Sequence, residues 1–178
     1  MHDLVVFSHL RWGLVHPGPQ HQLSRQAKDR RVYFVEEPEY AEGPVCMRVS
    51  SPCPGVTVLR PRTPIDAVGF ADEQFSVIEP LLRRSLSDRG VRQAVAWFYT
   101  PMALPLLQAV QAPRAVVYEC LDERSAFEFA PPQQLQREAE LLALADLVLA
   151  GGASPARGAR SAAARPSLLE LREQQVVL

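Results

Sequence analysis

The sequence lacks any apolar run near the roughly 18 residues that a membrane-spanning helix needs. It also lacks an early stretch that joins a basic region, an apolar core and a small-residue cleavage site, so we expect no secretory signal. Cysteine is scarce and odd in number, at positions 46, 53 and 120, which indicates free thiols in a reducing compartment. We therefore expect a soluble, cytoplasmic protein, with peripheral attachment to the inner face of the membrane as the alternative.

An excess of charge of one sign is also lacking. The 178 residues carry a formal net charge of −1, which gives no general electrostatic reason to bind a nucleic-acid polymer or an anionic lipid surface. Hydrophobic residues make up 47% of the chain and charged residues 22%. This composition argues against global disorder and suits one compact domain, with or without a tail.

Several motifs that carry chemistry are missing. No G-x-G-x-x-G follows the first apolar run and no G-x-x-x-x-G-K-[ST] occurs, so neither a dinucleotide site nor a P-loop is supported. Cys46 and Cys53 lack the close spacing of a zinc knuckle, and no histidine pair complements them. A triad of Ser8, His9 and Asp122 is disfavoured, because neighbouring strand residues point to opposite faces and no G-x-S-x-G elbow exists. We expect no metal and no cofactor.

Short apolar runs that alternate with helix-like segments are the main pattern present. Runs without polar interruption indicate strands buried on both faces, and the alternation indicates right-handed crossovers between parallel strands. We therefore predict an α/β fold: a single Rossmann-like domain over residues 1–155, with a mostly parallel sheet and helices on both faces. The predicted strands are residues 3–8, 31–36, 56–59, 94–99, 114–119 and 146–149.

Four helices are expected between these strands. One begins at Pro19, where a missing N–H costs nothing, and runs to about Arg30. A second begins with Asp72 as its cap and is kinked or split by Pro80. Its inner face is formed by Phe75, Ile78, Leu82 and Leu86. The other two are residues 103–111 and a helix opened by Pro131–Pro132, which carries Leu135, Ala139, Leu142 and Ala145 one or two turns apart.

Two stretches have weaker signals. Residues 39–55 contain several Pro and Gly positions and are predicted to be mostly loop. Residues 156–178 are predicted to be a low-complexity Ala/Arg/Pro tail, either a flexible linker or a poorly anchored helix. Its last apolar residues suit a terminal helix, but they cannot build a further domain.

Polar residues cluster just after the predicted strands. In an open α/β sheet, ligands bind outside the carboxyl ends of the strands. The sequence therefore predicts one rim that gathers imidazoles, carboxylates, hydroxyls and glycines. The clusters are SHLRWGLVHPGPQH at 8–21, Glu36-Glu37-Pro38, Tyr99-Thr100-Pro101-Met102, Glu119-Cys120-Leu121-Asp122-Glu123 and Gly151-Gly152.

The same clusters carry a resemblance to a known family. The phrases are FSHLRWGLVHPGPQHQLSR, VYFVEEP, WFYTPMALP and VVYECLDERSAFEFAPPQQLQREAELLALADLVLAGG. Together, over about residues 3–160, they resemble the N-terminal half of bacterial GT-B glycosyltransferases, similar to the teichuronic-acid and exopolysaccharide biosynthesis enzymes. The sequence departs from the family at Gly18, where the family usually has arginine, and at Glu119, where the family's YDC motif has aspartate.

The resemblance implies one half of a two-domain enzyme. The N-terminal Rossmann-like domain of such an enzyme binds the acceptor, a glycan or a lipid-linked sugar, and a C-terminal domain binds most of the nucleotide-sugar donor. Such enzymes usually need no metal. Because the resemblance fades beyond about Arg160, we expect a truncated or frameshifted product, or a half that works with a partner chain or with another copy of itself.

Each candidate site residue has a functional and a structural interpretation. We expect His9 and His21 to contact sugar hydroxyls or phosphate, or alternatively to bond backbone carbonyls. Arg11 suits an anionic group or a surface ion pair. Trp12 suits stacking on a sugar ring or anchoring of its loop.

The remaining candidates are mostly carboxylates and glycines. Asp122, with His9, is the expected catalytic residue, because a carboxylate there can take a proton from an acceptor hydroxyl; solvation or helix capping is the alternative. Of Glu36 and Glu37, one is expected to bind substrate and the other to end its strand. A ligand can approach the backbone closely at a Gly-Gly pair, although a tight turn explains that pair equally well. The expected substrate-binding residues are Arg11, Trp12, Gln20, His21, Glu37, Tyr99, Thr100, Glu123, Gly151 and Gly152.

The leading hypothesis is the acceptor-side half of a glycosyltransferase that is inactive alone. The first alternative is a non-catalytic carbohydrate-binding or partner-binding module. The second is an inactive fragment that exposes an apolar face.

Overall fold

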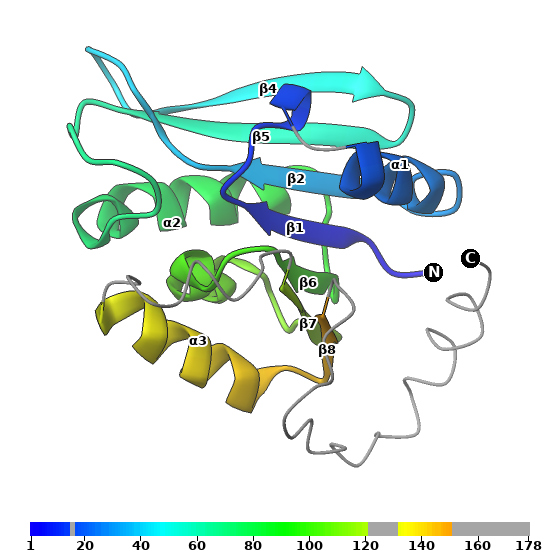
Figure 1. Ribbon diagram of the computed structural model, residues 1–178. Coiled ribbons are helices and arrows are strands. Elements are labelled where there is room, and N and C mark those ends of the chain that lie inside the picture. The colour runs from blue at the N-terminus through cyan, green and yellow to red at the C-terminus, as the bar shows by residue number, and fades with distance from the viewer. Residues whose placement is uncertain (15–16, 121–131, 151–178) are drawn as a thin grey trace.

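The computed structural model describes residues 1–14, 17–120 and 132–150 (Figure 1). Its strands are β1 (Leu4–Ser8), β2 (Val32–Glu36), β3 (Glu39–Tyr40), β4 (Cys46–Cys53), β5 (Val56–Thr63), β6 (Val95–Phe98), β7 (Ala115–Cys120) and β8 (Leu147–Ala150). Its helices are α1 (Pro17–Gln26), α2 (Asp72–Ser87) and α3 (Pro132–Leu144), with 3-10 helices η1 (Trp12–Leu14) and η2 (Pro101–Ala109).

The strands of the described residues form one eight-stranded sheet. The order is β3-β5-β2-β1-β6-β7-β8, and β4 pairs with β5 as the one antiparallel strand. The prediction of a Rossmann-like α/β fold with a mostly parallel sheet is confirmed. From β1 the chain moves to β2 and β5 on one side and then returns to β6, β7 and β8 on the other. The strand order therefore reverses between β1 and β6, which is the topological switch point of the sheet.

Helices cover both faces of the sheet (Figure 1). One face, called the α1 face, packs Leu23 of α1 and Trp12 against the sheet. The opposite face packs α2, η2 and α3 together over a second apolar cluster, which includes Ile78, Leu106 and Leu141. The division follows from right-handed crossovers. α1 connects β1 to β2, whereas α2, η2 and α3 connect strands that follow one another in the opposite direction across the sheet, so they lie on the opposite face.

The register aligns apolar side chains in rows across the α1 face. Side chains alternate between faces along each strand, so every second residue joins this face. The first row is Val56, Val32, Leu4, Val95 and Ala115, and the second is Val58, Phe34, Val6, Trp97, Val117 and Leu147. On the opposite face the rings of Phe7 and Phe98 stack with centroids 4.6 Å apart, which locks β1 against β6.

The prediction that residues 39–55 are mostly loop is wrong. Residues 46–53 form β4, which pairs antiparallel with β5, and β5 itself runs four residues beyond the predicted end. β4 forms because its backbone hydrogen-bonds to β5, a partner that the local sequence of β4 does not reveal. Pro52 is tolerated because it lies on the outermost strand, where the pairing register shifts between Ser50 and Cys53.

The helix from Asp72 forms as one element with its predicted inner face. Ile78, Leu82 and Leu86 are buried, while Phe75 is partly buried against the same cluster. Two details differ from the prediction. Pro80 does not split the helix, since it lies on the exposed side. The N-cap is Ala71, and Asp72 in the first turn instead pairs with Arg137 of α3.

The inner side of α3 differs from the sequence-based pattern. Leu135, Ala139 and Leu142 are exposed, whereas Leu141 and Arg137 are buried. Arg137 can be buried because it pairs with Asp72, lies over the ring of Phe75 and donates to the Met102 carbonyl. Arg137, with its charge paired, thus occupies the buried position where α2, η2 and α3 meet, and Leu135 and Leu142 lie on the exposed side of α3.

Candidate functional site

The last row of the α1 face, at the carboxyl ends of the strands, is polar. It follows directly on the two apolar rows and contains Arg60 of β5, Glu36 of β2, Ser8 of β1, Tyr99 just after β6 and Glu119 of β7. Ser8 and Glu36 are register partners. The residues before Tyr99 and Glu119 are also partners, as Phe98 and Tyr118, and the Tyr99 N–H donates to the Phe7 carbonyl at 2.9 Å. We call these five residues the polar row.

The part of the polar row formed by Arg60, Glu36 and Ser8, which we call the paired half, is satisfied by the protein itself. Glu36 is 1% exposed. One of its carboxylate oxygens accepts the Trp12 backbone N–H at 2.7 Å, and the other pairs with Arg60 and with Arg11. The Ser8 hydroxyl accepts the Leu10 N–H at 3.0 Å. These bonds fix the loop after β1.

The remaining part, Tyr99 and Glu119, is called the open half. Glu119 accepts the indole N–H of Trp97 at 3.0 Å. Tyr99 is 4% exposed, and no described residue meets its hydroxyl with a hydrogen bond of ordinary geometry. The hydroxyl nevertheless lies near enough to Glu119 for each group to influence the other. The open half thus presents a hydroxyl and a carboxylate side by side.

Burial dominates the pKa values of the open half. It raises the pKa of the Glu119 carboxyl, and the hydrogen bond from Trp97 and the nearby Tyr99 hydroxyl offset part of that rise. Burial, followed by the charge of Glu119, raises the pKa of the Tyr99 phenol well above its ordinary value. The phenol therefore stays protonated and acts as a hydrogen-bond donor.

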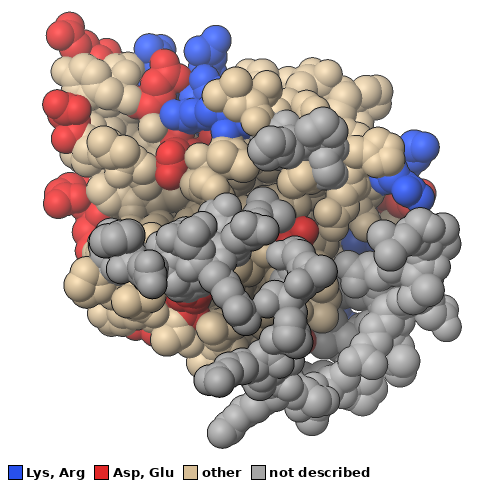
Figure 2. All heavy atoms as spheres, in the orientation of Figure 1, with Lys and Arg blue, Asp and Glu red and all other residues tan. Residues whose placement is uncertain are grey.

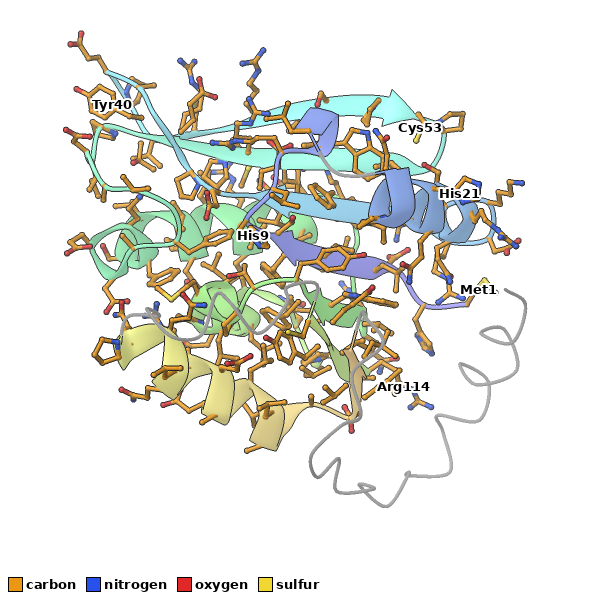
Figure 3. The ribbon with its side chains drawn as sticks, in the orientation of Figure 1. Met1, His9, His21, Tyr40, Cys53 and Arg114 are labelled. Atoms are coloured by element: carbon orange, nitrogen blue, oxygen red, sulfur yellow. The ribbon has the colours of Figure 1, made fainter. Side chains whose placement is uncertain are left out.

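Three of the predicted site residues lie at the switch point. His9 follows β1 directly, and Figure 3 shows it at the end of β1 in the middle of the molecule. Tyr99 and Thr100 follow β6, the neighbouring strand. Thr100 has a structural task as well, because its hydroxyl caps η2 by accepting the Met102 N–H at 3.3 Å. The sequence clusters SHLRW and YTPM are thus adjacent.

Arg11, Trp12 and Gln20 hold the loop after β1 in place. Arg11 donates to the carbonyls of Glu37 and Pro38 in addition to its ion pair with Glu36. Trp12 is 7% exposed and packs edge-on against the ring of Phe34, and Gln20 donates to the Trp12 carbonyl at 3.4 Å. These contacts favour the anchoring interpretation over contact with an anion or a sugar ring.

Of the two glutamates after β2, Glu36 is the buried one that ends the strand. Glu37 is partly buried, and burial raises the pKa of its carboxyl while the charge of Arg11 lowers it. Its carboxylate packs against Gly69, where an added Cβ would come within 2.9 Å. A shift of the flexible Glu37 side chain would relieve that contact, so it is the φ of +68° at Gly69 that favours glycine there. Glu37 stays a predicted substrate-binding residue at the rim.

The other predicted residues are not gathered with these. His21 is exposed on α1, and Figure 3 places it near Cys53, on the side of the molecule away from His9. Asp122, Glu123, Gly151 and Gly152 lie outside the described residues, as does the predicted tail from residue 156. The three cysteines form no disulfide with one another.

Two residues that matter were not singled out from the sequence. In the sequence, Glu119 is distinguished only as part of a cluster and as a departure from the YDC motif, and Trp97 only as part of a predicted strand. Both belong to apolar runs whose register against the neighbouring strands cannot be read from one sequence. A carboxylate that closes a run of buried residues was the one available signal for Glu119.

The rest of the described molecule offers less. A hollow of about 430 Å³ lies between the starts of β2 and β5, lined by Arg31, Tyr33 and residues 51–57, at the end of the sheet opposite the switch point. In Figure 2, basic and acidic side chains adjoin one another toward the upper left, over β4 and β5, and no large patch of one sign is visible. No group of three or more His, Cys, Asp or Glu within the described ranges is placed to hold a metal ion.

No family model and no curated protein matches the chain by sequence. Solved structures resemble it in fold. One, described as "Trehalose-6-phosphate from E. coli bound with UDP-2-fluoro glucose", is 14% identical with a TM-score of 0.49, over 82% of this chain and 39% of that one. An alpha,alpha-trehalose-phosphate synthase (UDP-forming) from Burkholderia xenovorans in complex with glucose-6-phosphate is 15% identical with a TM-score of 0.47, over 83% and 39%.

This chain therefore spans about two-fifths of the length of those structures. A likeness at this identity and TM-score does not assign an activity or a substrate. Among the residues that the structure describes, no helix is both long enough and apolar enough to cross a bilayer.

Proposed function

We propose that the chain is the acceptor-side half of a GT-B glycosyltransferase, which transfers a sugar from a nucleotide sugar to a hydroxyl acceptor in envelope or exopolysaccharide synthesis. The supporting observation is the placement of the family-like phrases. Those containing SHLRW, EEP, YTPM and YEC lie at the ends of β1, β2, β6 and β7, which are adjacent strands. Phrases up to about 110 residues apart thus come together at and beside the switch point, where sheets of this kind bind ligands.

The roles within this proposal follow from position. His9 stands at the switch point and is proposed to contact the reacting sugar hydroxyl or a donor phosphate. Asp122, two residues beyond β7, is proposed to accept the proton of the acceptor hydroxyl. The site for most of the donor belongs to a second Rossmann-like domain or a partner chain, and the reaction takes place between the two.

A half-enzyme should bind substrate without turning it over. We expect the purified 178-residue chain to release no nucleoside diphosphate from a nucleotide sugar in the presence of a hydroxylated acceptor, because the proposal assigns most of the donor site to another domain or chain. Sugar transfer by this chain alone would contradict the proposal.

Calorimetry separates the proposal from a carbohydrate-binding module that uses the same rim. The half-enzyme has to meet the donor across the cleft, so weak binding of nucleotide sugars is expected in addition to glycan binding. Binding of oligosaccharides with no binding of any nucleotide sugar favours the module. An overlapping reading frame after codon 178 that encodes a second Rossmann-like half would support the half-enzyme independently.

A further inference from the structure

The open half is the part of the polar row that the described protein leaves incomplete. In the paired half every carboxylate oxygen of Glu36 has a donor. In the open half the Tyr99 hydroxyl is buried without a hydrogen bond of ordinary geometry. Buried hydroxyl groups without a partner are rare, because a group taken from water loses a hydrogen bond that nothing replaces. Such a group, next to the Glu119 carboxylate at the carboxyl ends of the strands, points to a missing ligand.

The position of the open half fits ligand binding. Tyr99 lies immediately after β6, one of the two strands that flank the switch point, and Glu119 lies on β7 next to it. Open α/β sheets bind their ligands at this place. The predicted site residue His9, at the end of β1, borders the same place from the other side.

The charges at the open half select the kind of ligand. Glu119 is the acidic group there, and the two arginines that reach the paired half, Arg11 and Arg60, are already paired with Glu36. A phosphate would meet the carboxylate without a free cation to offset the repulsion. A neutral hydroxyl, which is both donor and acceptor, matches a phenol that donates and a carboxylate that accepts.

We propose that Tyr99 and Glu119 bind one hydroxyl group of a neutral sugar unit of the acceptor. The Tyr99 hydroxyl donates to the sugar oxygen, and the sugar hydroxyl donates to the Glu119 carboxylate. Trp97 positions this carboxylate through its indole N–H and is itself too buried, at 3% exposed, to stack on the sugar. The choice of a sugar as ligand rests on the proposed function, whereas the donor and acceptor groups are properties of the site.

The opposite face of the sheet offers a matched control. There the Tyr118 hydroxyl donates to Glu138 of α3 at 2.6 Å. This is also a buried tyrosine beside a glutamate, but the two satisfy each other and lie away from the α1 face. Tyr118→Phe therefore repeats the chemistry of Tyr99→Phe without touching the proposed site.

The two tryptophans provide the readout. The chain has Trp12 and Trp97 and no other tryptophan, so its 15N-labelled form gives two indole N–H resonances, which Trp97→Phe assigns. Titration of the full 178-residue chain with neutral methyl glycosides of glucose, galactose and N-acetylglucosamine should shift the Trp97 resonance saturably with at least one of them. The Trp12 resonance should not move, because Trp12 packs on Phe34 in the paired half.

Two near-isosteric variants complete the test. We expect Tyr99→Phe and Glu119→Gln each to weaken glycoside affinity about tenfold, as for loss of one hydrogen bond to a ligand, and Tyr118→Phe to change it less than twofold. Calorimetric binding with an unmoved Trp97 resonance, or wild-type affinity in Tyr99→Phe, overturns this inference and leaves the proposed function standing. Absence of calorimetric binding for the whole panel overturns both.

Discussion

The two halves of the polar row contain similar chemical groups but differ in whether the protein itself satisfies their hydrogen bonds. Both contain a carboxylate that ends a buried strand, at the same level of one sheet face. In the paired half, Glu36 is surrounded by two arginines and a backbone N–H. In the open half, Glu119 has an indole N–H, and the phenol beside it has no partner of ordinary geometry. The comparison separates a carboxylate that holds the fold together from one that is available to a ligand.

We expect the largest loss of folding stability when the paired half is disrupted. Glu36→Ala removes the shared acceptor of Arg11, Arg60 and the Trp12 N–H. We expect a loss of about 3 kcal/mol in the free energy of unfolding, at the lower end of the range for a broken buried pair because both arginines are partly exposed. Urea denaturation measures it. The control is Glu39→Ala, whose pair with Arg60 is more exposed and should be worth less than about 1 kcal/mol; equal losses in the two variants would contradict the structural role of Glu36.

The next largest expected effect is the difference in folding stability between phenylalanine variants of the two buried tyrosines. Tyr118→Phe leaves Glu138 without its donor and should cost about 1 kcal/mol of stability. Tyr99→Phe removes a hydroxyl without a hydrogen bond of ordinary geometry, so the free energy of unfolding should stay the same or rise slightly. Thermal or urea unfolding of both variants checks the difference. A loss in Tyr99→Phe as large as that in Tyr118→Phe would show that the phenol is satisfied within the protein.

The smallest expected effect concerns pH. Because burial raises the pKa of Glu119, the folded protein holds this proton more tightly than the unfolded chain. The resulting stabilisation is present below the ordinary carboxyl pKa and is lost as pH rises through the folded value. The stability of Glu119→Gln relative to the wild type should therefore increase between about pH 4 and pH 7. A difference that does not change with pH would argue against the raised pKa.

Much of the sheet could be predicted because parallel strands buried on both faces are continuous apolar runs. The runs at 3–8 and 31–36 match β1 and β2 to within a residue at each end. β4 could not be predicted in this way, since it lies on the outer side of β5 and is largely exposed. Its pairing with β5, rather than its own composition, makes it a strand.

The helices show the limit of apolar spacing. In α2 the spacing identified the three buried apolar residues, Ile78, Leu82 and Leu86, because one face alone meets the sheet. In α3 it selected Leu135 and Leu142, which are exposed, over Arg137, which is buried. Asp72, 65 residues earlier in the chain, pairs with Arg137 and compensates for the burial of its charge. No local pattern reveals this partner.

The candidate site was predictable in place but not in detail. Strand ends identified the rim, and the switch point brings His9, Tyr99 and Thr100 together there. The polar row itself depends on the register of five neighbouring strands, which a single sequence does not determine. For this reason the sequence does not distinguish Glu119 from the carboxylates that follow it. For Arg11 and Trp12 it leaves two interpretations open, ligand contact or a structural role, and the contacts of the folded chain favour the structural one.

The most direct test of the difference between the halves is the free energy of urea unfolding of Glu36→Gln and Glu119→Gln, measured together at pH 7. Both variants replace a carboxyl group of the polar row with an amide of the same shape. We predict that Glu36→Gln loses about 2 kcal/mol or more, while Glu119→Gln matches or exceeds the wild type. A loss of equal size in both variants would contradict the division of the polar row into a structural half and a ligand-binding half.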